Sequence, residues 1–125
     1  MPKAWIAAAL VGQTFLLSNG VRTRLRLARF SEAGAIGELL SRQGLDLEAH
    51  RLVQFDPRAR YVICAMALVD SNERVIGVGA IDLAADGADQ PDLLIVDPEI
   101  GEPVAQLLSH VLVGAAQTAA GVRAA

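Results

Sequence analysis

The sequence has almost none of the residues that form covalent or metal cross-links. Only one of its 125 residues is a cysteine, Cys64, and only two are histidines, His50 and His110. A single cysteine excludes an internal disulfide framework. The two histidines fall on separate predicted helices with no third ligand beside either, which argues against a zinc site. We therefore expect neither disulfides nor a metal to hold the fold together.

Aromatic residues are also scarce, at 4% of the chain, whereas hydrophobic residues make up 53% and charged residues 20%. That apolar share excludes a disordered chain, and 125 residues provide for one domain rather than two. The core must be built mainly from alanine, valine, leucine and isoleucine.

Lysine is nearly absent, and the charge is unevenly spread. Lys3 is the only lysine among eleven basic residues, and the net charge is −3. Residues 1–60 carry nine basic and five acidic side chains, a net charge of +4, whereas residues 61–125 carry two and nine, a net charge of −7. A uniformly basic nucleic-acid-binding protein is therefore not expected.

The N-terminal apolar run, Ala4 to Leu17, is too short for a membrane span. Its fourteen residues would rise about 21 Å as a helix, against a hydrocarbon core of roughly 30 Å. Four interpretations stay open: a signal peptide cleaved near Ser18-Asn19-Gly20, an amphipathic helix docked on the domain, a first strand with a turn at Asn19-Gly20, and a start codon placed too early. The rest of the chain is typical of a cytoplasmic protein. We expect an N-terminal extension over 1–20 and a domain over 21–121.

Residues 21–30 alternate between basic and apolar side chains. Arg22, Arg24 and Arg26 share one parity, which predicts a half-buried strand with an arginine row on one face. A solvated strand face explains such a row; a polyanion site is the alternative. Ser31 is the predicted N-cap of a helix over Glu32–Gln43, and Gly44 its C-terminal glycine.

The rest of the chain predicts an α+β fold, with a mixed, mainly antiparallel sheet flanked by helices. Apolar runs and turn signals predict strands over 60–69, 74–83 and 92–96, and apolar spacing predicts a helix over 102–120. A short helix over 46–53 is possible from the pattern, with Leu45 and Leu52 as its apolar contacts. Cys64 lies in the middle of the first of these three strands, which is typical of a packing residue rather than a nucleophile.

Four stretches in this order resemble the GNAT family of N-acetyltransferases. They are V-R-T-R-L-R-L-A-R-F-S-E-A-G-A-I-G-E-L-L, L-V-Q-F-D-P-R-A-R-Y-V-I-C-A-M-A-L, R-V-I-G-V-G-A-I-D-L and L-L-I-V-D-P-E-I-G-E-P-V-A-Q-L-L. The resemblance implies a truncated GNAT-like fold in which acetyl-CoA lies between two splayed strands, 74–83 and 92–96, and an amine attacks the thioester directly.

The resemblance also implies site residues. It gives Asp82 as the general base and a set of cofactor-binding residues: Gly77, Gly79, Ile95, Val96, Gly101, Glu102 and Val104. Gly77 and Gly79 would leave room for the pantetheine arm. Close packing of a helix on the sheet explains these two glycines equally well.

The cofactor loop departs from the family pattern V-x-P-x-x-R/Q-x-x-G-x-G/A. Only one glycine, Gly101, remains, the Arg or Gln is missing, Glu99 and Glu102 add negative charge, and Pro103 removes an amide donor. The family's last strand, helix and strand are also missing from the match, which would leave an unpaired sheet edge. The alternative function is therefore an inactive remnant that binds a partner chain or forms a homodimer.

Overall fold

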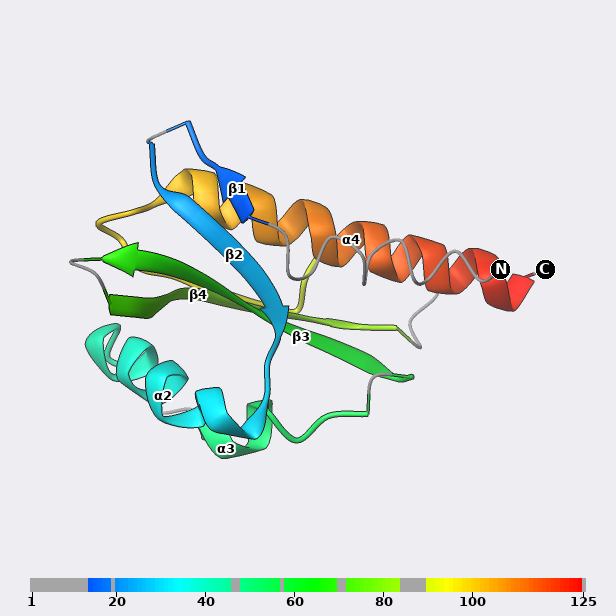
Figure 1. The fold of residues 1–125 in the computed structure, drawn as a ribbon. Coiled ribbons are helices and arrows are strands. Elements are labelled where there is room, and N and C mark those ends of the chain that lie inside the picture. Colours follow the sequence, from blue (N-terminus) through cyan, green and yellow to red (C-terminus); the bar gives the residue numbers. More distant parts are fainter. Residues whose placement is uncertain are drawn as a thin grey trace.

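The computed structural model describes residues 14–18, 20–45, 48–56, 58–69, 72–83 and 90–124, and in them five strands form one open sheet (Figure 1). The strands lie in the order of the sequence, and every neighbouring pair is antiparallel. The α+β class is confirmed, but the sheet is not mixed, because each connection returns the chain in the opposite direction. The strands are β1 Thr14–Leu16, β2 Arg22–Leu27, β3 Arg60–Val69, β4 Asn72–Asp82 and β5 Leu93–Val96.

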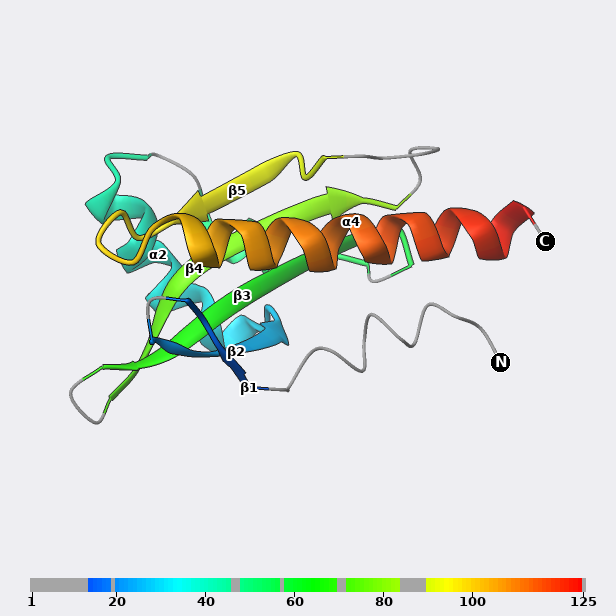
Figure 2. The ribbon, with the colours of Figure 1, turned by 90° about the horizontal axis from the view of Figure 1, so that it is seen from above.

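Helices cover both faces of the sheet. The 3-10 helix η1 (Phe30–Glu32) and the helices α2 (Ala33–Arg42) and α3 (Ala49–Leu52) lie on one face. The long helix α4 (Glu102–Ala124) crosses the other face and extends beyond the strands (Figure 2). None of the helices in the described part of the chain is long and apolar enough to span a membrane.

The helix α2 forms where the spacing predicted it. Ile36, Leu39 and Leu40 are fully buried and pack on one side of the sheet. Burying each such side chain stabilises the fold by about 1.5–3 kcal/mol. The helix ends at Gly44, whose positive φ of 70° lets the Leu45 amide donate to the Leu40 carbonyl. The side chain of Leu45 is 41% exposed, so its predicted packing role is wrong.

The start of this helical segment differs from the prediction. Ser31 is not the cap; the carboxylate of Glu32 accepts a hydrogen bond from the Arg29 amide at 2.9 Å. The sequence pattern favoured a serine cap at the junction between strand and helix. Instead, the chain enters α2 through the short 3-10 helix η1, which brings the Glu32 carboxylate back to the backbone amide of Arg29. The second helix is also shorter than predicted, and Asp46 lies outside the described residues.

The helix α4 packs its predicted stripe on the sheet. The buried residues of this stripe form a second core cluster with Leu25 of β2; they are Val104, Leu108, Val111 and Leu112. The helix extends beyond the predicted end, to Ala124. The two clusters lie on opposite faces of the sheet, so most strand residues contribute to one or the other.

Thr14–Leu16 form a strand and Ser18 lies in a turn, as one of the four interpretations of the N-terminal segment predicted, although Asn19 of the predicted turn lies outside the described residues. β1 pairs with β2, and the Leu17 amide donates to the Val21 carbonyl across the turn. Within the described residues the sheet therefore begins at Thr14, ahead of the domain boundary predicted at residue 21. Residues 1–13, including Trp5, lie outside the described part of the chain.

Candidate functional site

The predicted cofactor strands are paired, not splayed. β4 and β5 are in register over four residues, with Gly77 opposite Val96 and Gly79 opposite Leu94. The backbone edges that the pantetheine arm would use are thus bonded to each other. The prediction that these two strands splay apart is therefore wrong for this part of the sheet.

Both glycines lie directly under α4. A Cβ placed at Gly77 would lie 3.0 Å from Val104 Cγ1 and 3.0 Å from Leu108 Cδ1. A Cβ at Gly79 would lie 2.6 Å from Leu112 Cδ1. Close helix packing therefore accounts for both glycines with no ligand, which was one of the two explanations that the sequence allowed.

The remaining predicted cofactor residues divide between the two faces. Ile95 packs with the α2 cluster, whereas Val96 packs with the α4 cluster. Val104 is fully buried on the side of α4 that faces the sheet, and Glu102 is exposed at the start of that helix. These side chains do not converge on one surface.

Backbone amides of the loop between β5 and α4 donate hydrogen bonds to acceptors within the same loop. The buried Asp97 accepts the Glu99 amide on Oδ1 at 3.0 Å, and its backbone carbonyl accepts the amides of Ile100 and Gly101. The Val104 amide donates to the Gly101 carbonyl at 3.2 Å. Since Pro103 has no amide, few donors are left at this helix start for a phosphate.

Two arginines hold the carboxylate of this loop. Arg74 Nη2 lies 3.3 Å and Arg42 Nη1 3.7 Å from Oδ2 of Asp97. The loop thus already contains an anion with two cationic partners. Glu99 and Glu102 are exposed beside it, so a second anion would meet repulsion.

Asp82, the predicted general base, lies away from this loop. It is exposed at the end of β4, whereas the Asp97 amide bonds the carbonyl of Ile76, six residues earlier on the same strand. Six strand residues span about 20 Å. The structure therefore does not bring the predicted base and the cofactor loop together.

Cys64 is buried in β3, and its Sγ donates to the Arg26 carbonyl at 3.6 Å. Burial, with a smaller contribution from the nearby Glu32 carboxylate, raises the pKa of the Cys64 thiol to about 12. A thiol protonated throughout the neutral range is a poor nucleophile. The prediction that Cys64 is a packing residue is confirmed.

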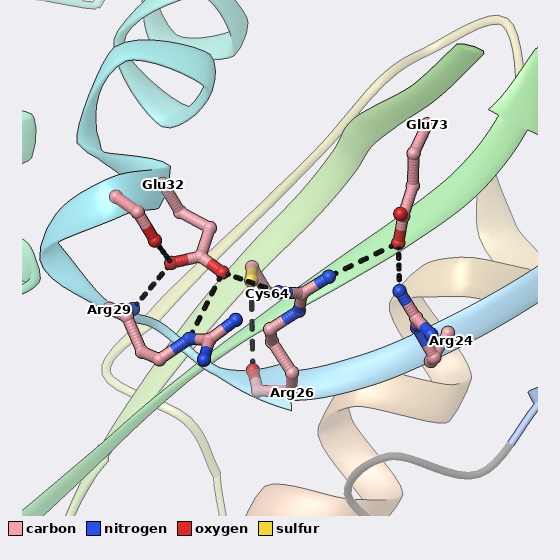
Figure 3. A network of polar contacts seen from close by, with 7 residues as sticks. Arg24, Arg26, Arg29, Glu32, Cys64 and Glu73 are labelled. Carbon is pink, nitrogen blue, oxygen red and sulfur yellow. Dashed lines mark hydrogen bonds and ion pairs between the residues drawn. The ribbon is translucent and has the colours of Figure 1, made fainter.

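The arginine row of β2 is where the structure brings charged side chains together (Figure 3). Arg24 and Arg26 both contact Oε1 of Glu73, and Arg26 Nη2 does so at 3.2 Å. Arg26 Nη1 also lies 3.1 Å from Oε1 of Glu32, which is 5% exposed, and Arg29 Nε lies 3.5 Å from the same atom. The alternation identified the row but not its acidic partners, because the contacts depend on the β3–β4 hairpin register.

A hollow with a volume of about 630 Å³ lies between α3 and the start of β3. Its charged side chains already have partners: Arg51 pairs with Glu48, and Arg60 pairs with Asp92. No group of three potential metal ligands occurs among the described residues. His50 instead lies edge-on to the ring of Phe30, with centroids 5.5 Å apart.

Comparison with protein-family models, with curated proteins and with solved structures finds no match for the chain. A proposal of function must therefore come from the geometry and from the sequence resemblance.

Proposed function

We propose that the chain is a non-catalytic binding module built on an acetyltransferase-like architecture. The order of its elements from β2 to α4 agrees with the order that the resemblance implies for that family. The observation that carries the proposal is the loop after β5, whose amides at Glu99, Ile100 and Gly101 all donate to Asp97. A pyrophosphate at a helix start needs such amides to be free.

Titration with acetyl-CoA tests this proposal. We expect no heat of binding and no thermal shift at millimolar acetyl-CoA, because an anion would have to break the internal bonds of the loop and approach two exposed glutamates. If saturable binding appears and the substitution Gly101→Asp removes it, the proposal is wrong. Gly101 adopts a φ of 74°, so an aspartate there would both strain the loop and add charge.

The second candidate is the N-acetyltransferase itself, in which an amine attacks the thioester of acetyl-CoA and Asp82 takes up the amine proton. The exposed position of Asp82 at the end of β4 favours this candidate, because a base must reach solvent-borne substrate. Its distance from the loop counts against it. The titration above distinguishes the two candidates.

The outer side of β5 pairs with none of the described strands and is a candidate surface for self-assembly. β5 is the last strand of the described sheet, and its sequence Leu-Leu-Ile-Val carries no charge or proline that would block pairing. The carboxylates flanking it are already neutralised, since Asp92 pairs with Arg60 and Asp97 with Arg74. We infer that two copies pair through this edge.

Light scattering tests the homodimer. At high concentration we expect twice the monomer mass for the unmodified chain and the monomer mass for Leu94→Lys, because a lysine at the edge disfavours strand addition. Leu45→Lys is the matched control, since Leu45 is 41% exposed and Leu94 is 39% exposed. A monomeric unmodified chain, or equal effects of the two lysines, would contradict this pairing.

A further inference from the structure

One part of the sheet is not covered by any helix that the structure describes. The cluster beneath α2 and α3 takes its buried residues from the helices, β3, β4 and Ala28, but none from β1 or from β2 itself. On that side β2 presents Arg22, Arg24 and Arg26. The residues around this uncovered area, which we call the arginine face, are Thr14, Leu16, Arg22, Arg24, Met66 and Glu73.

The pairing register places these side chains together. Leu16 lies opposite Arg22, Thr14 lies opposite Arg24, and Arg24 lies opposite Met66 on the other side. Residues opposite each other in an antiparallel pair project from the same face. The arginine face is therefore a continuous surface across β1, β2 and β3, to which β4 contributes Glu73, and part of it is a shallow hollow of about 220 Å³.

The charge of this face is only partly neutralised. Arg24 and Arg26 share one oxygen of Glu73, and that carboxylate is itself 37% exposed. Arg22 is exposed, and none of the described residues is recorded as its hydrogen-bond or ion-pair partner. Arg26 also pairs with the buried Glu32, at 3.1 Å. Arg22 and the half-exposed Arg24, with only the shared Glu73 beside them, keep the arginine face positive on a chain whose net charge is −3.

Leu16 distinguishes this face from an ordinary solvated strand. Its side chain is 74% exposed, the highest fraction among the large hydrophobic residues of the described chain. Interfaces between proteins combine apolar contacts with arginine, whereas binding to a nucleic-acid backbone depends on charge alone.

We propose that the arginine face binds an acidic, extended segment of another protein, with carboxylates on two alternate residues and an apolar side chain at the next alternate position, so that all three project from one side of the segment. Arg22 and Arg24 are two residues apart on one strand and so lie about 7 Å apart, which matches carboxylates two residues apart on an extended chain. Leu16, beside Arg22, contacts the apolar side chain. The inference names the partner of the binding module proposed above and rests on that proposal.

Fluorescence anisotropy with a labelled peptide tests the inference. The probe is Glu-Gly-Glu-Gly-Leu-Gly-Glu, in which the glutamates and the leucine project from one side of the extended chain, and its control is the same peptide with every Glu replaced by Gln. We expect saturable binding of the acidic peptide alone, weakening strongly as salt rises from about 0.01 M to 0.1 M, because the Debye length falls from about 30 Å to about 10 Å. Equal binding of the two peptides would overturn the inference.

Single substitutions in the full chain test whether the peptide binds at the arginine face. Arg22→Glu should weaken binding roughly tenfold by removing one cation and adding a like charge. Arg51→Glu makes the same charge change on α3 and should leave binding unchanged, since Arg51 is exposed and lies outside the face. Leu16→Ser should also weaken binding, whereas Leu45→Ser should not. Equal effects within either pair would overturn the assignment.

The substitution Glu73→Gln should raise the affinity for the acidic peptide, an effect that a purely structural role of Glu73 would not produce. Because it removes the carboxylate that Arg24 and Arg26 share, the acidic peptide should bind roughly two- to fivefold more tightly. An unchanged affinity, or tighter binding of a single-stranded oligonucleotide of equal charge, would overturn the inference. If neither the acidic peptide nor acetyl-CoA binds, only the proposed role of the arginine face is wrong. If acetyl-CoA binds, the proposed function as a non-catalytic module is wrong.

Discussion

Replacing Leu112 with alanine should lower the free energy of unfolding by about 2–5 kcal/mol, and adding a methyl group at Gly79 should recover part of that loss. Leu112 is fully buried in α4, and its Cδ1 would lie only 2.6 Å from a Cβ at residue 79. Truncating Leu112 leaves a cavity at the place where that methyl group would go. The two substitutions therefore act on the same small volume.

The single substitution Gly79→Ala should itself be destabilising, by about 1–3 kcal/mol, because the methyl group overpacks a filled space. In the double variant Gly79→Ala with Leu112→Ala, the methyl group no longer meets Leu112, and its next contacts, Leu93 O and Leu94 Cδ1, lie at 3.4 Å. Urea denaturation of the four chains gives the coupling energy of the cycle, which should be favourable by about 1–2 kcal/mol.

Gly77→Ala is the matched control for this cycle. A Cβ at Gly77 would meet Val104 and Leu108 but is not among the neighbours of Leu112. Its effect should therefore add to that of Leu112→Ala within about 0.5 kcal/mol. Additivity at Gly79 as well would mean that α4 packing does not explain that glycine.

Much of the fold could be predicted because each element carries its own local pattern. The alternation of Arg22, Arg24 and Arg26 identified β2, and the apolar run over 60–69 identified β3. Both signals depend on neighbours within one element, so no long-range information was needed. The end of α2 was also local, since Gly44 alone supplies the positive φ.

The candidate site was less predictable because it depends on how elements meet. Whether β4 and β5 splay or pair is decided by their register, and no residue of either strand specifies it alone. Gly79 had two explanations until α4 was placed over it. The contact between Arg24 and Glu73 joins residues 49 apart, and only the β3–β4 hairpin brings them together.

Replacing Glu32 with glutamine should cost about 2–3 kcal/mol, because it leaves two guanidiniums beside a buried site that has lost its charge. Oε1 of Glu32 has no hydrogen-bond partner and is held by ion pairs alone, from Arg26 at 3.1 Å and Arg29 at 3.5 Å. A glutamine would place its amide group there, or turn round and lose the bond from the Arg29 backbone amide. The effect stays below the largest values for buried pairs because Arg26 and Arg29 are 23% and 63% exposed.

Glu73→Gln is the matched control, because Glu73 contacts Arg26 from the exposed side. Its carboxylate is 37% exposed, so water and salt screen its ion pairs and the expected loss is below about 1 kcal/mol. Chemical denaturation of both variants measures the difference. Equal losses would mean that Glu32 acts as a surface charge. A larger loss at Glu32 would mean that the buried Glu32, not Glu73, holds the arginine row in place. Glu73 could then release Arg24 without unfolding the strand. Binding of an external carboxylate at the arginine face requires such a release.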